Sequence, residues 1–252
     1  MERAARVALI TGSGKRRVGW HVAEALAGRG YAIALHYRRS SAEAQETVDQ
    51  FRRGGITAEA FPADLGDEGA TRRFVHQVLD RFGRIDVLVN AASIWEKKRL
   101  EDTTADDVRR HFEANVLGTF LVSQQAGLAM VGQPEGGGIV TIGDWAESRP
   151  YRDYPAYFAT KGAIPTLTRC LAVELGTRNP RVRVNAILPG PVMLPPDLPA
   201  AEREEAIAGT LVRREGSPAN IAQAVLYLVE NDFVTGSCLT VDGGRTIYDG
   251  RA

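Results

Sequence analysis

The sequence predicts an α/β fold in which a parallel sheet lies between two layers of helices. Short apolar runs alternate with longer segments of helical periodicity from one end of the chain to the other. The apolar runs, such as VALIT at 7–11 and AIALHY at 32–37, lack the alternation of a strand with one wet face, so both faces are expected to be buried. Repeated strand–helix units imply right-handed crossovers, and therefore a Rossmann-type, doubly wound sheet of about seven strands flanked by helices.

Each element follows from its own pattern. The expected strands are at 7–11, 32–37, 57–62, 86–90, 139–142, 182–187 and 238–241. The expected helices are at 18–29, 42–53, 69–82, 105–130, 157–175, 200–212 and 219–230. Two helix starts carry clear signals. Thr104 with Asp107 predicts a capping box, and Ser217 before Pro218 predicts an N-cap followed by a proline in the first turn.

Length and charge limit the possible functions. The chain has 252 residues, and 31 Lys+Arg balance 31 Asp+Glu. No linker or change of composition divides it, so we expect one domain over 1–252. Zero net charge argues against a nucleic acid or an anionic membrane as the main partner. Two distant cysteines, and four histidines without i, i+4 spacing, predict no disulfide framework and no metal site.

The stretch 114–134 carries no charge, which raises the question of a membrane span. Its polar residues, Asn115, Thr119 and Gln124 among them, would be costly in hydrocarbon, so a buried or subunit-facing helix is the better interpretation. The N-terminal segment runs directly into the first strand and has no signal-peptide pattern. We therefore expect a cytoplasmic protein without a membrane partner.

The turn after the first strand, TGSGKRRVG at 11–19, is a candidate phosphate-binding loop. A helix N-terminus attracts anions, and glycines let the backbone approach a pyrophosphate closely. The turn is neither a G-x-G-x-x-G fingerprint nor a Walker A loop. On this segment alone, a plain strand-to-helix turn with solvated charges stays open.

The end of the second strand, HYRRS at 36–40, sharpens that interpretation. NAD-selective folds usually place an acid there for the ribose 2′-hydroxyl, and this stretch has none. Guanidinium groups and a hydroxyl suit a 2′-phosphate instead, which predicts NADPH. A Ser40 that caps the next helix with Glu43 is compatible with this. The side chains expected to gather there are Lys15, Arg16, Arg17, His36, Tyr37, Arg38, Arg39 and Ser40.

A tyrosine and a lysine at i, i+4 spacing, Tyr157 and Lys161, open the predicted helix after the fifth strand. The spacing puts them on one helix face, where the ammonium is expected to lower the tyrosine pKa toward the range useful for proton transfer. The motif is common by chance, but here it lies at the carboxyl edge of the sheet, where ligands bind. Asp144 follows the same strand. Asn115 lies in the long preceding helix, where a local, helix-bending role is the alternative.

Together these residues resemble the short-chain dehydrogenase/reductase family over nearly the whole chain. The matching motifs are Thr11-Gly12…Gly19, Asp64-Leu65, Asn90-Ala91-Ala92, Asn115, Tyr157…Lys161, Pro189-Gly190-Pro191-Val192 and Val241-Asp242-Gly243-Gly244. The resemblance implies that Tyr157 donates a proton, that Lys161 binds the nicotinamide ribose and tunes Tyr157, and that Asn115 supports a water relay. It also implies that the cofactor is contacted by Gly12, Gly19, Asp64, Leu65, Asn90, Ala91, Ser93, Lys161, Pro189, Gly190 and Val192. Of these, Asp64 and Leu65 would flank the adenine, Asn90 would steady the central strand, and the Pro-Gly segment would bracket the nicotinamide.

Three departures from the usual family pattern are informative. Asp144 stands where most members carry Ser, the motif after strand four reads Asn90-Ala91-Ala92-Ser93, and the glycine loop is longer and carries an arginine in place of its middle glycine. The first two, with the basic ending of strand two, resemble the pteridine reductase branch, which includes bacterial dihydromonapterin and dihydrofolate reductases. In that branch an aromatic residue stacks on the pterin, and Trp95 matches it. The alternative for Trp95 is packing against 99–100.

The resemblance implies hydride transfer from NADPH to a pterin C=N bond, with Tyr157, assisted by Lys161 and Asp144, giving the proton to nitrogen. The expected substrate contacts are Ser93, Trp95, Asp144 and Tyr157. A carboxylate accepts hydrogen bonds from a heterocycle, and donates one when protonated, whereas an ionised carboxylate would repel a ketone oxygen. Two alternatives stay open. One is an NADPH-dependent reductase of ketones such as a 3-oxoacyl thioester or a sugar, and the other is a non-catalytic NADP-binding sensor.

The segment 193–213 is expected to be the lid over the substrate. Its three prolines before an acidic helix predict a stiffened, exposed structure, but they do not name a substrate. The family resemblance also implies a homotetramer built on the long helices at 105–130 and 157–175. The uncharged stretch after Asn115 is compatible with such an interface, and equally with a buried core.

Overall fold

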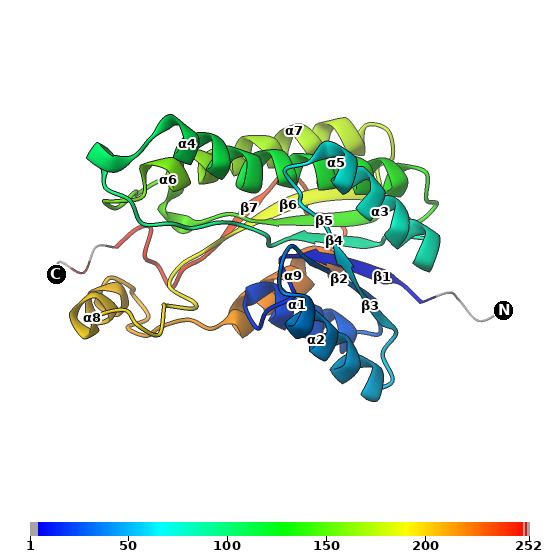
Figure 1. The fold of residues 1–252 in the computed structure, drawn as a ribbon, viewed down its shortest axis with the longest axis horizontal. Coiled ribbons are helices and arrows are strands. Elements are labelled where there is room, and N and C mark those ends of the chain that lie inside the picture. Colours follow the sequence, from blue (N-terminus) through cyan, green and yellow to red (C-terminus); the bar gives the residue numbers. More distant parts are fainter. Residues whose placement is uncertain (1–4, 249, 251–252) are drawn as a thin grey trace.

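The computed structural model describes residues 5–248 and 250, and a single parallel sheet forms its centre (Figure 1). The strands lie in the order β3-β2-β1-β4-β5-β6-β7, and every neighbouring pair is parallel. Their bounds are β1 Val7–Thr11, β2 Ala32–Tyr37, β3 Ala58–Pro62, β4 Val87–Asn90, β5 Gly137–Ile142, β6 Val182–Pro189 and β7 Cys238–Val241. This confirms the predicted seven-stranded, doubly wound α/β domain, in which the strand order reverses between β1 and β4.

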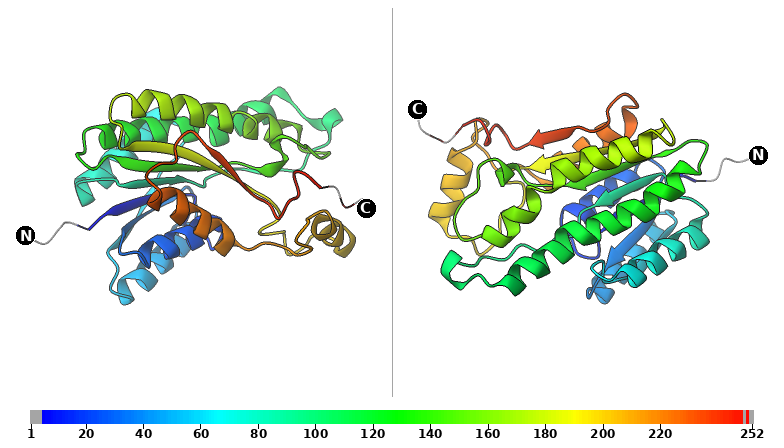
Figure 2. Two further views of the ribbon diagram at one scale, coloured as in Figure 1. Left: turned by 180° about the vertical axis from the view of Figure 1, so that it is seen from behind. Right: turned by 90° about the horizontal axis from the view of Figure 1, so that it is seen from above.

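Helices cover both faces of the sheet (Figures 1 and 2). One layer contains α1 Val18–Ala27, α2 Ser41–Arg53 and α9 Pro218–Glu230, and the other contains α3 Glu68–Phe82, α4 Ala105–Phe112, α5 Gly118–Val131, α6 Pro155–Lys161 and α7 Ile164–Gly176. In β1, Ala8 and Ile10 belong to the core under the first layer, whereas Leu9 belongs to the core under the second. Fully buried side chains on both faces explain why the apolar runs of the sequence do not alternate.

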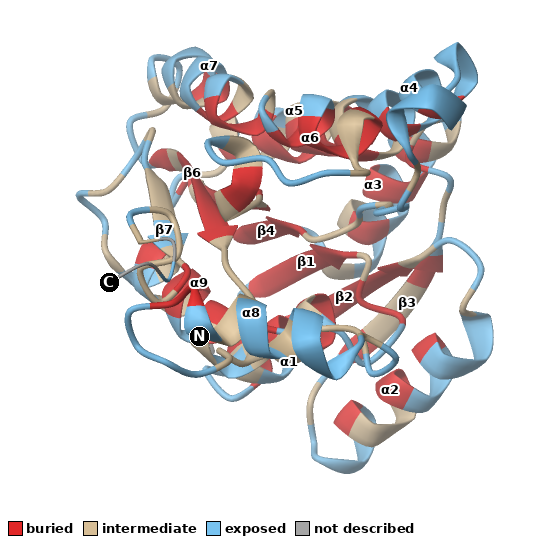
Figure 3. Ribbon diagram, turned by 90° about the vertical axis from the view of Figure 1, so that its left-hand side faces the viewer, coloured by how far each residue is buried: buried red, intermediate tan, exposed pale blue. Residues whose placement is uncertain are grey.

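Helix α8, Ala200–Ala208, lies outside both layers, beyond the carboxyl ends of the strands (Figures 1 and 2). It contains no buried residue, and Figure 3 shows it without the red of the surrounding core. It ends earlier than the predicted residue 212, because Gly209 and a turn with Arg213 at φ +54° follow it. The predicted lid is therefore a short helix held at its ends.

Two long helices of the sequence prediction are interrupted. The predicted helix 105–130 consists of α4, a π-helical turn at Glu113–Leu117, and α5. The predicted helix 157–175 starts earlier, at Pro155, and is divided into α6 and α7. The reason for the division is Pro165, which has no N–H to donate to the carbonyl of Lys161 and therefore cannot continue the helix. Both interruptions lie next to residues expected to be catalytic, Asn115 within the first and Lys161 before the second.

The capping predictions fare differently. Thr104 and Asp107 form the expected reciprocal capping box, and Ser217 caps α9 with Asn220 as its partner. Ser40 occupies the N-cap position of α2, but its side chain makes no capping hydrogen bond. Of the helices in the part of the chain that is described, none combines the length and apolar composition needed to cross a membrane.

Candidate active site

Three of the four expected catalytic side chains meet at the carboxyl edge of the sheet. Asp144 follows β5, while Tyr157 and Lys161 lie on α6. The Tyr157 hydroxyl donates a hydrogen bond to Asp144 Oδ2 at 2.7 Å, and Asp144 Oδ1 accepts one from the Ala146 N–H at 2.9 Å. The aspartate that the sequence singles out is therefore a direct partner of the tyrosine.

Lys161 is buried beside this pair. Its ammonium donates to the Ile142 carbonyl at 2.9 Å, and its Nζ lies 5.6 Å from the centre of the Tyr157 ring. Burial lowers the pKa of Lys161 to about 8, while the Asp144 charge opposes that shift. The lysine therefore titrates in the mildly alkaline range, where a solvent-exposed lysine would be fully charged.

The pKa of Tyr157 corrects the expectation from the sequence. The sequence predicts that the Lys161 ammonium lowers it, but burial and the Asp144 charge raise the pKa of Tyr157 well above its usual value. The main physical reason is that burial disfavours the charged phenolate, and the hydrogen bond that the phenol donates to Asp144 further stabilises the protonated form. Tyr157 is therefore a hydroxyl at neutral pH and a weaker acid than an ordinary tyrosine, so donation of its proton requires stabilisation of the phenolate.

A second acid lies close to Asp144. Burial raises the pKa of Asp144, although the Ala146 N–H, the Tyr157 hydroxyl and the Lys161 charge work against it. Glu147 ends the 3₁₀ turn Trp145–Glu147, and burial together with the Asp144 charge raises its pKa to about 7. Within the described residues, its buried Oε2 has no hydrogen-bond partner. Neighbouring buried carboxyl groups disfavour double ionisation, so the site retains a proton near neutral pH.

Asn115 connects the loop after β4 to α6 from within the π-helical turn. Its amide nitrogen donates to the Ile94 carbonyl and the Thr160 hydroxyl, both at 3.0 Å. Its oxygen accepts from the Ile94 N–H at 2.8 Å and from the Ser93 hydroxyl at 3.1 Å. Thr160 in turn donates to the Tyr157 carbonyl at 2.6 Å. The Asn115 side chain therefore links the loop after β4 to α6. This is more than the local, helix-bending role that the sequence leaves open.

The turn between β1 and α1 has the shape of a diphosphate cradle. Gly12 has a φ of +66°, and a Cβ there would lie 2.7 Å from the Ala92 Cα. A Cβ at Gly19 would lie 3.0 Å from the Gly12 carbonyl oxygen. The Thr11 hydroxyl accepts hydrogen bonds from the Ala91 and Ala92 N–H groups, both at 3.1 Å, and so joins the turn to the end of β4. Glycine is therefore required for the close packing of this turn, and the N-terminus of α1 that follows it suits the NADP diphosphate.

Exposed cations surround this cradle. Lys15 pairs with Glu43 at 3.8 Å, and Arg38 pairs with Asp64 at 2.8 Å. All four side chains are half exposed or more, so these pairs are weak and can open for a phosphate. Arg17 and Arg39 are exposed as well.

The turn and α2 also meet directly. Arg16 donates to Gln50 at 2.9 Å and lies over the Trp20 ring. A hollow of about 260 Å³ between the turn and α2 is lined in part by Gly14 and Arg16. A Cβ at Gly14 would lie 2.6 Å from the Ser40 hydroxyl and 2.8 Å from Tyr37 Cβ. The two basic segments of the sequence are therefore neighbours, as expected.

His36 does not belong to the exposed cations. It is 2% exposed, and its ring accepts from the Gly12 N–H at 3.2 Å and contacts the Ala63 carbonyl at 3.1 Å. Burial lowers the pKa of His36 to about 4, so the ring is neutral at pH 7. The sequence counts it as a basic group aimed at the phosphate, and the structure corrects this. His36 instead supports the glycine turn from the protein interior, by accepting the hydrogen bond of the Gly12 N–H.

Two of the remaining predicted cofactor contacts, Asn90 and Leu65, have side chains that are packed inside the protein. The Asn90 amide donates to Ser123 at 2.8 Å and Thr141 at 3.4 Å, which ties β4 to α5 and β5 as expected. Leu65 packs in the core, and a Cβ on Gly118 of α5 would lie 2.9 Å from its Cβ, so only its backbone is left to flank an adenine.

At the other end of the expected cofactor site, the segment that includes Pro189 and Val192 is fixed by β7. The Gly190 N–H donates to the Val241 carbonyl at 3.0 Å. A Cβ on Gly190 would lie 2.5 Å from the Asp242 Cα, so glycine allows the close approach. Val192 is buried. This segment therefore has a fixed position at the carboxyl end of β6.

Trp95 packs face to face on Tyr154, with ring centres 4.9 Å apart and planes 7° apart. This replaces the alternative of packing against 99–100. Tyr151 and Phe158 complete an aromatic cluster, with their centres 4.7 Å apart in an edge-to-face contact. One face of Trp95 is thus covered by Tyr154, while 43% of the residue remains exposed.

Tyr151 and Tyr154 are site residues that the sequence analysis misses. The available signal is two further aromatic residues shortly before Tyr157, in the loop that follows the fifth strand. Asp153 between them has a φ of +69°, and its carbonyl accepts from the Lys98 N–H at 2.7 Å. That bond joins their loop to the segment of Trp95. Within the described residues, no group of three or more His, Cys, Asp or Glu side chains could hold a metal ion.

Comparison with known proteins gives a consistent picture. Residues 13–246 match the family described as enoyl-(acyl carrier protein) reductase. An uncharacterised oxidoreductase of Methylorubrum extorquens is 34% identical, over 95% of this chain and 97% of that protein. Acetoin dehydrogenase from Enterobacter cloacae is 32% identical with a TM-score of 0.88, over 100% of this chain and 99% of that one.

A gluconate 5-dehydrogenase from Burkholderia cenocepacia, solved in complex with NADP and tartrate, is 29% identical with a TM-score of 0.89. The match covers 97% of this chain and 96% of that one. The chain belongs to the short-chain dehydrogenase/reductase family of oxidoreductases.

Proposed function

We propose that the protein is an NADPH-dependent reductase that transfers hydride to a pterin-type C=N bond, in the class of dihydropterin, dihydromonapterin and dihydrofolate. The observation that carries the proposal is the hydrogen bond from Tyr157 to the Asp144 carboxylate. An acid beside the proton donor suits a substrate with N–H and amino groups, because a carboxylate accepts hydrogen bonds from them.

Several features support NADPH as the cofactor. The glycine turn lies before the N-terminus of α1, which would attract the diphosphate, and Arg38, Arg39, Ser40 and the cations of the turn would hold the 2′-phosphate. The adenine would lie near Asp64, the nicotinamide ribose near Lys161 and Asn90, and the nicotinamide beside the segment that begins at Pro189. When bound, NADPH supplies the hydride, and the protein supplies the proton.

In this proposal Tyr157 gives its proton to the substrate nitrogen. Its raised pKa keeps the hydroxyl protonated before reaction. The lost proton is replaced from solvent, and Glu147, whose pKa is raised to about 7, is a nearby carboxyl that can carry a proton near neutral pH. Lys161 stabilises the phenolate that forms once Tyr157 has given up its proton. Asn115 acts as a positioning residue, because it holds both the Ser93 loop and α6.

The aromatic cluster supports a planar substrate. Trp95 is stacked on Tyr154, which fixes the plane of the indole, and its exposed part can stack on a second flat ring. Ser93 lies at the same place through its bond to Asn115. The test is a panel of dihydrobiopterin, dihydromonapterin and dihydrofolate with purified protein, followed by the absorbance of NADPH. Failure to oxidise NADPH with all three would exclude the pterin assignment.

A ketone reductase is the second candidate, with a sugar or a 3-oxoacyl thioester as substrate. It is favoured by relatives that are named an acetoin dehydrogenase and a gluconate 5-dehydrogenase. A raised pKa would also let a protonated Asp144 donate to a ketone oxygen. The same panel with ketones separates the two substrates. A non-catalytic NADP-binding sensor is the third candidate, and it predicts NADPH binding without turnover, unchanged in Tyr157→Phe.

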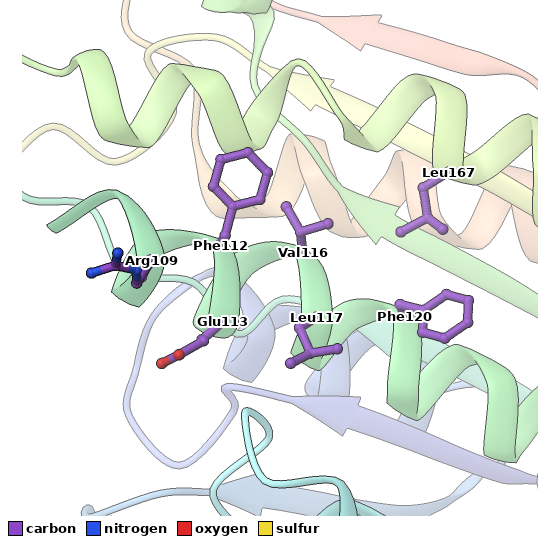
Figure 4. A pocket seen from close by; sticks show the side chains of 7 residues that line it. All are labelled: Arg109, Phe112, Glu113, Val116, Leu117, Phe120 and Leu167. Atoms are coloured by element: carbon purple, nitrogen blue, oxygen red, sulfur yellow. The ribbon is translucent and has the colours of Figure 1, made fainter. Parts of the chain in front are cut away.

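We also propose that the protein is a homotetramer. A hollow of about 400 Å³ lies on the outer side of the α4–α5 helix, where Phe112, Val116, Leu117 and Phe120 meet Leu167 of α7 (Figure 4). This hollow is apolar and holds no catalytic residue, so it suits a second copy of the chain rather than a substrate.

A second apolar face lies at the β7 edge of the sheet, where Phe233 is 96% exposed and Tyr227 is 50% exposed. Two separate faces are what a tetramer of twofold interfaces needs. Light scattering should give a tetramer for the natural chain and a smaller species for Leu117→Asp. Leu100→Asp, at an exposed site outside both faces, is the control. A monomeric natural chain would refute the assembly.

A cytoplasmic location is part of the same proposal. Cys170 and Cys238 are both free thiols, which agrees with a reducing compartment. The segment 193–213, with α8 at its centre, is proposed as the substrate lid. Cell fractionation tests the cytoplasmic location, and hydrogen exchange in α8 tests the lid.

A further inference from the structure

Residues 242–248, which we call the C-terminal strap, follow β7 at the substrate end of the site. In Figures 1 and 2 the chain turns from β7 toward α8 and passes beside it. Asp242 fixes the shape of the strap, since its Oδ1 accepts from the Gly244 N–H at 2.8 Å and its Oδ2 accepts from the Thr246 N–H at 2.6 Å. The strap is therefore an ordered turn with a defined conformation.

Arg245 attaches the strap to the lid helix. Its Nη1 donates to the carbonyls of Glu205 at 3.0 Å and Ala206 at 3.3 Å, both in the last turn of α8. A Cβ on Gly209 would lie 1.2 Å from that nitrogen, so only glycine permits the approach. Because α8 has no buried residue, polar contacts of this kind carry much of its attachment.

The turn after α8 is attached to the strap as well. The Gly243 carbonyl accepts from the N–H groups of Leu211 at 2.8 Å and Val212 at 3.2 Å. Arg213 donates to the Tyr248 hydroxyl at 2.8 Å. The lid is thus bonded to the strap on both sides of Gly209.

The same strap holds the loop that carries Asp144. Arg149, in this loop, donates through Nη1 to the carbonyls of Arg245 at 2.8 Å and Tyr248 at 2.9 Å. The Arg245 guanidinium also lies 5.4 Å from the centre of the Trp145 ring, a cation–π contact with the residue next to Asp144. One arginine therefore touches both the end of the lid helix and the neighbour of the catalytic carboxylate.

We propose that the strap couples closure of the lid to the placement of Asp144, with Arg245 and Arg149 as the positioning residues. The inference rests on the proposed function for the role of Asp144. With α8 seated, the helix end holds Arg245, and Arg245 holds Trp145, so Asp144 stays where Tyr157 donates to it. When α8 lifts, Trp145 loses its cation. Closure over a substrate then completes the proton-donating pair.

Hydrogen exchange on the full chain tests the coupling without any substrate. The hydrogen bonds of Arg149 go to the strap, so Arg149→Leu removes no direct contact with α8. Coupling predicts faster exchange in α8 of this variant, by about 2- to 10-fold, which corresponds to the net loss of about one hydrogen bond. Unchanged exchange in α8 would overturn the proposal.

Reciprocity supplies the second arm, because a coupling acts equally in both directions. Arg203 holds α8 through Glu215 at 2.6 Å and the Pro195 carbonyl at 2.9 Å, away from the Asp144 loop. Arg203→Leu should therefore speed exchange at 144–149 as well as in α8, and an effect confined to α8 would contradict the coupling. Arg178→Leu, which removes an exposed pair with Glu174 on α7, should change neither segment.

Kinetics separate positioning from a purely structural role. Arg245→Leu should lower kcat more than it raises KM, because Asp144 loses its place in the reacting pair. Arg245→Lys keeps a cation over Trp145 and should restore most of kcat. Equal effects of the two variants would overturn the role of Arg245. If the natural chain reduces no pterin and the two segments still exchange together, the proposed substrate falls and the coupling stands.

Discussion

The two halves of the carboxyl edge of the sheet handle charge in opposite ways. Beside β1 and β2, cations such as Lys15 and Arg38 are half exposed and pair loosely with acids. Beside β5, Asp144, Tyr157 and Lys161 are buried together, and burial is the main cause of the shift in each pKa. Holding a polyanion needs several solvated cations, whereas moving a proton needs desolvated groups whose pKa values have been changed.

The largest expected effect is at the buried half. Tyr157→Phe removes the proton donor and keeps the ring, so kcat should fall by about 10²- to 10⁴-fold while NADPH affinity stays unchanged. Steady-state kinetics and a fluorescence titration with NADPH measure the two quantities. Tyr31→Phe, directly before β2 and so at the opposite edge of the sheet, is the control. A Tyr157→Phe enzyme with normal kcat would mean that charge burial at β5 has no catalytic purpose.

His36 is the exception in the exposed half, and it tests whether burial alone accounts for the comparison. Its pKa is about 4 when folded and about 6.5 when unfolded. Between these values the unfolded chain binds more protons, so stability is lost as pH falls from about 6.5 to 4, by about 3 kcal/mol in total. Urea unfolding at pH 7 and pH 4.5 measures this loss. It should be smaller in His36→Gln, and an equal loss would show that other groups cause it.

A smaller effect is expected from the solvated cations. Replacing both Arg38 and Arg39 with Ala should weaken NADPH binding by about 10- to 100-fold and leave NADH binding nearly unchanged, because only NADPH carries the 2′-phosphate. Titrations with both cofactors at two salt concentrations measure this preference and its screening. Arg178→Ala, at an exposed position just after α7, should change neither affinity. Equal losses of affinity for NADPH and NADH would mean that the two arginines do not contact the 2′-phosphate.

The smallest effect is expected at the aromatic cluster. Trp95→Leu removes a stacking surface but no charge, so KM for the pterin should rise by about 2- to 10-fold with little change in kcat. Initial rates over a range of pterin concentrations give both values. Trp95→Phe should retain most of the affinity. A fall in kcat without a change in KM would instead place Trp95 in the proton-transfer step.

Much of this arrangement can be predicted from the sequence. The apolar runs predict the strands because burial on both faces leaves few polar positions in them, and Tyr157, Lys161 and Asp144 follow from their places after the fifth strand. The interruptions at Asn115 and Pro165 are harder to predict, because each depends on one residue inside a long helical pattern. The hydrophobic periodicity of a helix is an average over many residues, so a single interrupting residue does not show in it.

The pKa values and the supporting contacts are the least predictable part. His36 reads as a cation in the sequence, but its charge depends on burial under the glycine turn. Tyr157 reads as a phenol beside an ammonium, but its closest partner is a carboxylate. The bond of Arg245 to α8 joins distant segments through a glycine that has no signal of its own. These properties depend on tertiary neighbours that composition and spacing do not encode.

The central claim is that Asp144 and Tyr157 together select a pterin. The most direct test is NADPH oxidation with a panel of pterins and ketones, run in parallel on the natural chain and on Asp144→Ser. The account predicts turnover of at least one dihydropterin by the natural chain, and loss of that turnover in Asp144→Ser with folding and NADPH binding retained. Turnover of ketones alone, or pterin turnover that survives in Asp144→Ser, would contradict it.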